Sequence, residues 1–444
     1  MYLGDASSSQ FSPLTQITRE NVHQLERVWE YHSENGNAKG QIQCNAIIID
    51  GVLYATSPNL KLFALDAATG AEKWVFDPLD GGSSGGVNRG VSYWRDGEDT
   101  RILYTVQSYL YAVDARTGKI IPSFGEDGRI DLREGLGREP SELFVGSNTP
   151  GIVFDDLIIM GTRVSEGLPS APGHIRAYDV ESGEQVWIFR TIPGPGEFGY
   201  ATWPKEAWEY TGGANAWSGF SLDSARGIVF VPTGSAAYDF YGANRTGDNV
   251  FANSLIALEA KTGKRLWHFQ TVHHDLWDRD LPAPPNLLTV THDGKRIDAV
   301  AQITKSAHVF LFDRVTGVPL FPIKEVAVPG SDLPGEVAAK TQPIPTKPPV
   351  FSREVFLEED VTNISPEAHA HVLERLKRYR TGRTFIPPSR EGTVILPGFD
   401  GGGEWGGAAV NPHTGIMYVN ASEMPWVLMM VGAQSRDESR SHAK

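Results

Sequence analysis

The sequence predicts an all-β protein, a β-propeller built from four-stranded blades. Three observations support this prediction. A short motif recurs along the chain, in which an acidic residue is followed by two variable residues, Thr or Ser, and Gly. In three copies a Trp stands eight residues after the acid. Apolar runs typical of buried strands, such as 52–55 and 228–231, accompany the motif. Such regular repetition indicates a propeller.

Each copy of the motif has the chemistry of a β-hairpin turn. An Asp side chain can accept hydrogen bonds from the turn backbone, and Gly adopts the positive φ that such a turn needs. The alternative, unrelated hairpins in a sandwich, does not account for a Trp at a constant offset, which can stack between neighbouring sheets. The copies with Trp are 65–70 with Trp74, 178–183 with Trp187 and 258–263 with Trp267, and the weaker copies are 113–118, 312–317 and the degenerate 411–415.

Composition limits the possible functions. The chain has 444 residues, 40% hydrophobic content and a formal net charge of −14, which disfavours a nucleic-acid partner. No apolar run is long enough to span a membrane, although membrane association stays possible. Residues 1–10 show no signal peptide. Cys44 is the only cysteine, which excludes an internal disulfide and a metal site built from cysteines.

We expect a single propeller domain over residues 1–444, with two interruptions. The segment 325–349 is rich in Pro and is interpreted as a surface excursion or linker. The segment 365–380 begins with Ser before Pro and has apolar residues at helical spacing, which predicts an inserted helix.

The stretch 271–285, TVHHDLWDRDLPAPP, is the strongest candidate for a functional loop. It follows a strand-like run at 264–270 and carries the carboxylates Asp275, Asp278 and Asp280. Loops on a rigid scaffold often carry function. The alternative is an acidic turn exposed to solvent, since carboxylates are mostly exposed.

Three motifs give the chain its resemblance to a known family. They are 87–94 (VNRGVSYW), 244–248 (NRTGD) and 271–280 (TVHHDLWDRD). With the Trp-containing hairpins, they resemble the quinoprotein dehydrogenases, and most closely the propeller of membrane glucose dehydrogenase and its soluble relatives. The resemblance covers essentially the whole chain. It implies an eight-bladed propeller that binds pyrroloquinoline quinone (PQQ) and a cation, Ca²⁺, Mg²⁺ or a lanthanide.

The resemblance also implies catalytic roles. The family transfers a hydride from a C–H that bears an alcohol to the quinone, while a carboxylate takes the hydroxyl proton. By the motif, that base is Asp278 and not Asp275, and a nearby cation would lower its pKa. Lys305 matches the lysine that contacts the quinone oxygens. Arg89 matches the arginine that pairs with cofactor carboxylates or catalytic oxygens.

Further residues match the cofactor and metal sites of the family. Trp217 matches the indole under the quinone ring, although a Trp that packs between blades is the alternative. Thr149 is a weaker cofactor contact, and Trp405 lies in the matching motif 404–407. The expected metal ligands, by the same resemblance, are Glu166, Ser235, Asp278 and Asp280.

Several positions depart from the family pattern. The adjacent cysteines of methanol dehydrogenases fall on Ser83 and Ser84. An amide ligand is replaced by Ser235 and a threonine ligand by Ala237, so the metal site is only partly accounted for. Trp94 stands where the glucose enzyme has a histidine on the substrate side, which makes glucose a doubtful substrate.

The family's propeller continues past the motif 404–407, and some members add a haem domain with a Cys-x-x-Cys-His site, so we expect an incomplete ring and no cytochrome domain. The resemblance implies a periplasmic oxidoreductase for an alcohol, polyol or aldose that passes electrons to a quinone or a cytochrome c. Two other functions remain open: a non-catalytic scaffold of the cell envelope, and a metal-dependent propeller hydrolase or lactonase.

Overall fold

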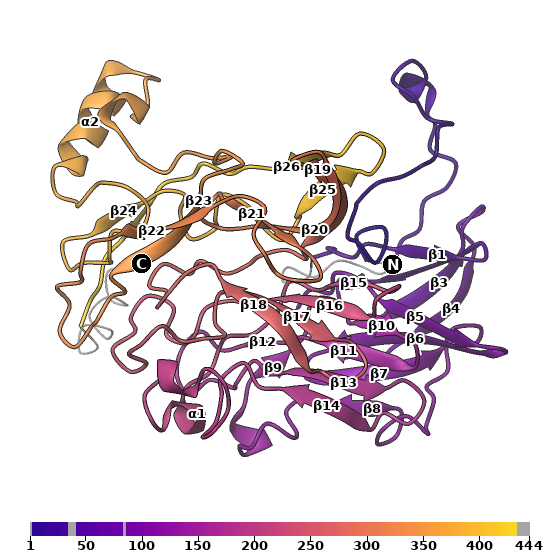
Figure 1. The fold of residues 1–444 in the computed structure, drawn as a ribbon. Helices are drawn as coiled ribbons and strands as arrows, with labels where there is room; N and C mark the ends of the chain where they lie inside the picture. Colours follow the sequence, from indigo (N-terminus) through magenta and orange to yellow (C-terminus); the bar gives the residue numbers. More distant parts are fainter. Residues whose placement is uncertain (1, 34–40, 83–85, 433–444) are drawn as a thin grey trace.

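The computed structural model describes residues 2–33, 41–82 and 86–432 (Figure 1). In these ranges, four antiparallel sheets have four strands each, in simple sequential order, and a fifth has three. This architecture confirms the predicted propeller blades. Their strands are β1 Ile47–Ile49, β2 Val52–Thr56, β3 Leu62–Asp66 and β4 Glu72–Phe76; β5 Ser92–Asp96, β6 Asp99–Val106, β7 Tyr109–Asp114 and β8 Arg129–Asp131; β10 Ile152–Phe154, β11 Leu157–Met160, β13 Ile175–Asp179 and β14 Gln185–Phe189; β15 Ser221–Asp223, β16 Ile228–Pro232, β17 Ser254–Glu259 and β18 Arg265–Gln270; and β19 Asn286–His292, β20 Lys295–Ile303 and β21 Val309–Asp313.

The remaining elements are short. Among the described residues, four pairs of strands form two-stranded sheets, and two α-helices and four 3₁₀ helices lie between blades or outside them. They are β9 Val145–Gly146 with β12 Arg163–Val164; β22 Ile323–Ala327 with β23 Thr341–Pro345; β24 Thr393–Ile395 with β27 Trp426–Leu428; β25 Ala408–Asn411 with β26 Ile416–Val419; α1 Ala207–Tyr210 and α2 Pro366–Leu376; and η1 Val22–Gln24, η2 Pro140–Glu142, η3 Tyr200–Thr202 and η4 Glu358–Asp360. Within the described residues, no helix combines the length and the apolar character that a membrane span requires.

The repeated motif forms the turn between the third and fourth strands of its blade. In the first copy, Asp66 Oδ1 accepts hydrogen bonds from the backbone N–H groups of Ala68 and Thr69 and from Thr69 Oγ1. Gly70 follows with φ of +72°. Asp114, Asp179 and Asp313 make the same set of bonds in their copies, which confirms the turn chemistry expected from the sequence.

The Trp of each complete motif ties its blade to the next one. Trp74 Nε1 donates to Ala115 O at 3.1 Å, Trp187 Nε1 to Ala260 O at 3.0 Å, and Trp267 Nε1 to Arg314 O at 3.1 Å. Each indole lies directly on the turn glycine of the following blade. A Cβ on Gly118, for example, would stand 2.6 Å from the Trp74 ring. These glycines are therefore needed for close packing as well as for their φ angle.

The core lies between successive blades. All residues of β11 and β16 are buried, and Ile159 and Val229, both 0% exposed, belong to one apolar cluster that joins the third and fourth sheets. Apolar residues on both faces of a strand are expected where sheets pack on either side.

The N-terminal segment lies against β19 and β25. Leu287 N donates to Ser7 O at 3.0 Å, and Val410 N donates to Ser9 O at 2.8 Å. Asn286 Nδ2 donates to Ser8 O at 2.6 Å and to Ala408 O at 2.8 Å. Residues 7–9 thus bridge β19 of the fifth blade to β25.

The Pro-rich segment 325–349 is more ordered than a linker. Its ends pair as the antiparallel strands β22 and β23, and Gln342 is 0% exposed. The interpretation as a surface excursion was therefore wrong for its buried part. The helix expected at 365–380 is α2, which begins after Ser365, whose Oγ accepts from Ala368 N at 3.1 Å, and ends at Leu376.

A buried histidine makes stability depend on pH. Burial lowers the pKa of His174 to about 3, and Arg176, Arg190 and Arg138 reinforce the effect. Between pH 6.5 and about 3 the unfolded chain therefore binds more protons at this residue than the native state, so stability falls as pH falls. His174 alone is expected to remove about 2 kcal/mol of unfolding free energy between pH 6.5 and 5.

The test compares the protein with His174→Asn, because Asn keeps an acceptor for the Thr191 N–H that now bonds to His174 Nδ1. Urea unfolding at several pH values between 7 and 4.5 should show a shallower pH dependence in the variant. Equal pH dependence would contradict the assignment of this effect to His174.

Candidate active site

The functional loop 271–285 leaves β18 and is organised around Asp275. This side chain is 2% exposed. Its carboxylate accepts from Asn253 Nδ2 at 2.8 Å, Trp277 N at 2.9 Å and Arg279 N at 2.6 Å, and also from Ser235 Oγ. With four donors, Asp275 fixes the path of the loop backbone. The sequence-based choice against Asp275 as the base agrees with this structural role.

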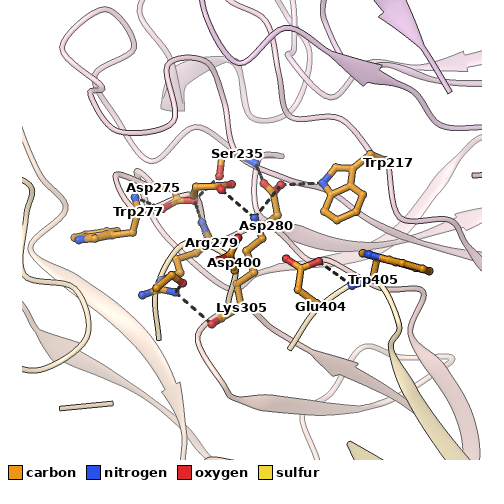
Figure 2. A network of polar contacts seen from close by, with 12 residues as sticks. Trp217, Ser235, Asp275, Trp277, Arg279, Asp280, Lys305, Asp400, Glu404 and Trp405 are labelled. Atoms are coloured by element: carbon orange, nitrogen blue, oxygen red, sulfur yellow. Dashed lines mark hydrogen bonds and ion pairs between the residues drawn. The ribbon is translucent and has the colours of Figure 1, made fainter. Parts of the chain in front are cut away.

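The side chains of Trp277 and Arg279 point away from the Asp280 carboxylate (Figure 2). Trp277 Nε1 donates to Ile386 O at 2.7 Å. Arg279 is 1% exposed and donates to the carbonyls of Lys305 at 3.3 Å, Gly398 at 3.0 Å and Pro397 at 2.6 Å. Because these residues alternate with Asp278 and Asp280, they leave those two carboxylates on the opposite side.

The two histidines support the loop from outside. His274 is 2% exposed; its Nδ1 lies 2.7 Å from Gly247 O and its Nε2 lies 2.7 Å from Glu336 Oε1. The backbone of His273 is bonded twice to the Gln342 side chain. Glu336 and Gln342 both belong to the Pro-rich segment 325–349, so this segment stabilises the conformation of the loop. The two histidines therefore act as packing and hydrogen-bonding supports of the loop.

Asp278 and Asp280 face a cavity of about 200 Å³. Asp278 adopts φ of +55°, a left-handed conformation that Asp tolerates better than most residues. The structure brings seven of the nine predicted site residues to this cavity. Its lining consists of Arg89, Asn148, Arg163, Val164, Ser165, Glu166, Gly213, Asn215, Trp217, Ser235, Asp239, Asp278, Asp280 and Lys305.

A chain of polar contacts crosses the cavity (Figure 2). Lys305 Nζ lies 2.9 Å from Asp278 Oδ2 and 3.8 Å from Asp280 Oδ2. Asp280 Oδ2 also accepts from Trp217 Nε1 at 2.8 Å, and its Oδ1 accepts from Ser235 N at 2.6 Å. Asp280 therefore links the indole to the lysine, and Asp278 has Lys305 as its single hydrogen-bond partner among the described residues.

The cavity has more carboxylates than neighbouring cations, and the pKa shifts reflect this. Burial raises the pKa of Asp278 well above its usual range, Lys305 opposes the shift, and Asp280 and Asp239 add to it. Burial lowers the pKa of Lys305, but Asp278, Asp280 and Glu404 outweigh it and raise the pKa overall. Lys305 is thus charged. The lowered pKa expected for Asp278 is not found in the protein alone, because burial and repulsion exceed the attraction of Lys305.

The remaining cofactor candidates surround Arg89. Its guanidinium carbon lies 5.3 Å from the ring centre of Trp217 and 4.6 Å from that of Trp405. Its Nη1 donates to Thr149 Oγ1 at 3.4 Å, and Thr149 Oγ1 donates to Trp217 O at 2.8 Å. Thr149 and Trp405 do not line the cavity, but both contact Arg89, which does.

The donor set of the cavity fits both groups that the resemblance implies. Arg89, Arg163 and Lys305 offer positive charge to an anionic ligand beside the Trp217 ring. The carboxylates offer the hard oxygen ligands that Ca²⁺ or a lanthanide prefers. Within 2–33, 41–82 and 86–432, no three acidic or histidine side chains already converge as a metal site would.

Two of the predicted metal ligands, Glu166 and Ser235, are less favourably placed to bind a cation than expected. Glu166 is exposed at the rim of the cavity. The Ser235 hydroxyl donates its proton to Asp275. Asp239, which the sequence-based reasoning missed, is 8% exposed and lines the cavity. The sequence offered one signal for Asp239: it stands two residues after Ala237, in the stretch where Ser235 and Ala237 replace two ligands of the family.

Two other expectations have different outcomes. Trp94 is 5% exposed, packs in the core between blades, and donates from Nε1 to Asp156 Oδ1 at 3.2 Å. It does not line the cavity. Ser83 and Ser84 lie outside the described residues.

The fold and the site together define a propeller with a deep polar cavity, in which a lysine and several carboxylates lie beside an indole. The family model described as glucose/ethanol/alcohol dehydrogenase, beta-propeller domain, matches residues 1–444, and the chain belongs to this PQQ family. The recognition from the sequence is thereby confirmed.

Known relatives agree with this assignment. The chain is 33% identical over 458 residues to the quinoprotein glucose dehydrogenase of Gluconobacter oxydans (strain 621H), which covers 96% of this chain and 56% of that protein. It is 31% identical over 462 residues to the glycerol dehydrogenase large subunit of the same organism, with 98% and 61% covered. A solved quinohemoprotein alcohol dehydrogenase from Pseudomonas putida HK5 gives a TM-score of 0.71 at 25% identity, with 96% and 57% covered. The chain thus spans a little over half the length of these relatives.

Proposed function

We propose that this chain binds PQQ and a cation in the cavity and oxidises the CH–OH group of an alcohol, polyol or aldose. The observation that carries the proposal is the pair of Asp278 and Lys305, 2.9 Å apart, in one cavity with Trp217 and Arg89. Relatives named for glucose and glycerol dehydrogenation support the substrate class.

When bound, the quinone would accept the hydride and the cation would polarise it. Asp278 is the group placed to take the hydroxyl proton of the substrate, at the carboxylate that now contacts Lys305. Lys305 supplies a fixed positive charge for the reduced, anionic form of the cofactor. Asp280 accepts a hydrogen bond from Trp217 Nε1, and this bond orients the indole as a flat wall of the cavity.

The finer parts of the proposal concern partners and location. We place the protein in the periplasm, with a quinone or a cytochrome c as the electron acceptor, because the family resemblance implies both. Ca²⁺ is the first cation to test, followed by Mg²⁺ and a light lanthanide, since the carboxylates of the cavity suit all three.

The experiment is reconstitution of the purified protein with PQQ and each cation, followed by dye reduction with a panel of alcohols, polyols and aldoses. Bound-quinone absorbance and substrate-dependent dye reduction are expected. Their absence with every cation would overturn the proposal. Lactone hydrolysis without PQQ would instead support the hydrolase, and loss of both activities in a folded protein would support the scaffold.

A further inference from the structure

We propose that Asp239 is a ligand of the cation in this cavity and supplies the oxygen donor that this chain lacks at Ala237. The inference rests on the proposed function for the identity of the site as a cation site. It concerns a residue that neither the motifs nor the resemblance singled out.

Hydrogen bonds to neighbouring residues fix the loop that carries Asp239. The loop leaves β16 at Pro232, and Gly234 N donates to Asn215 O at 2.9 Å. Ala237 N donates to Gly212 O at 3.0 Å, and Tyr238 O accepts from Arg245 Nη2 at 2.7 Å. The backbone on the N-terminal side of Asp239 is therefore fixed, and the position of its side chain at the cavity is a property of the fold.

The Asp239 carboxylate is buried without a partner. The residue is 8% exposed and lines the cavity, yet across the described ranges it forms no hydrogen bond or ion pair. Asp275 by contrast accepts from four donors, and Asp280 accepts from two. Buried charges in proteins are normally paired or bind metals. Glu166, at the same cavity, also lacks a protein donor among the described residues but is exposed. Asp239 is therefore the buried carboxylate of the cavity without a protein donor.

The surroundings of Asp239 favour a cation over a protein partner. Asp280, Glu166 and Asp275 all repel its negative charge, and the attraction of Arg245 is weaker. Arg245 is already bonded to Asn249 Oδ1 and to the carbonyls of Tyr238 and Asp275. A multivalent cation would turn this repulsion into attraction, since Ca²⁺ and similar ions take six to eight oxygen ligands.

Asp239 also occupies the right segment to compensate for the replaced ligands. The Ser235 hydroxyl donates to Asp275 and accepts from Asn253 Nδ2 at 3.2 Å, and Ala237 has no side-chain oxygen. Asp239 follows Ala237 by two residues on the same loop and restores an oxygen donor there. The added negative charge favours a cation of high charge density.

The test is binding of Tb³⁺, and separately of Ca²⁺, to the protein without PQQ. Trp217 lines the same cavity and can sensitise Tb³⁺ luminescence, while calorimetry reports Ca²⁺. Asp239→Asn is expected to raise both dissociation constants by about 10- to 100-fold, the range typical when a supporting group of a metal site is removed. The matched control is Asp293→Asn, which makes the same charge change at an exposed turn where φ is +48° and Asn is tolerated.

A stability measurement separates a ligand from a merely structural acid. Without a cation, Asp239→Asn should melt no lower than the unsubstituted protein, because it removes repulsion and breaks no hydrogen bond. With Ca²⁺, the unsubstituted protein should gain the larger increase in Tm. Unchanged Tb³⁺ affinity in Asp239→Asn, or a lower Tm of this variant without cation, would overturn the proposal. If Tb³⁺ binding depends on Asp239 but PQQ supports no dye reduction, this inference stands and the proposed function fails.

Discussion

Asp278→Asn is expected to lower kcat by about 10²- to 10⁴-fold, the usual contribution of a general base. The substitution keeps the size of the side chain and suits the positive φ of residue 278. Lys305 loses its partner at 2.9 Å but keeps Asp280 at 3.8 Å. The affinity for PQQ should therefore change little while proton removal fails.

The measurement is steady-state dye reduction by the reconstituted enzyme at saturating Ca²⁺, with PQQ affinity measured in parallel. Asp400→Asn is a suitable control, because Asp400 is a nearby exposed carboxylate outside the cavity whose Oδ2 accepts from Trp426 Nε1. Its activity should stay close to that of the unsubstituted enzyme. Activity of Asp278→Asn within tenfold of the unsubstituted enzyme would mean that the base is misassigned.

Asp275→Ala is expected to have the largest effect on stability. Four donors share this buried carboxylate, and two of them are backbone N–H groups of the functional loop. Truncation leaves these donors unsatisfied and creates a cavity, which together should lower the free energy of unfolding by about 3–5 kcal/mol. Because Arg279 N and Trp277 N lose their anchor, activity should fall as well.

Urea unfolding with and without Ca²⁺ measures this effect. Asp275→Asn provides a graded comparison, since one side-chain oxygen still accepts while the new amide group faces donors. Its loss of stability should lie between zero and that of the alanine variant. A loss below about 1 kcal/mol for Asp275→Ala would show that the loop is held mainly by Arg279 and Trp277.

The repeated turns were predictable because their causes are local. Asp66 and Gly70 act within one turn, so the residue types alone define the hydrogen bonds and the backbone angle. The Trp offset also predicted the contact between blades. The second blade lacks the Trp, and Gly183 accordingly approaches the backbone of Gly125. Trp29, outside the repeat, covers Gly70 in the first blade.

The sequence predicted the site residues that belong to the family motifs, but not the other residues of the site. The place of Asp278, Lys305 and Trp217 in one cavity agrees with the family pattern. The motif distinguished Asp278 from Asp275, but the structural role of Asp275 depends also on donors from Ser235 and Asn253, which no local pattern reveals. Glu336 and Asp239 were missed for the same reason. Their importance arises from burial and from neighbours distant in sequence, as in the contact of Glu336 with His274.

The contacts of the N-terminal segment with β19 and β25 affect the expected order of folding. Ser8 bonds to a side chain 278 residues away, and Gln10 Nε2 donates to Gly406 O, 396 residues away. Contacts of such long sequence separation form slowly, because a large loop must close before they stabilise the chain. During synthesis, residues 7–10 must wait for β19 and β25 to emerge from the ribosome. The contacts of residues 7–10 are therefore expected to be among the last to form, after the strands within the earlier blades have already paired.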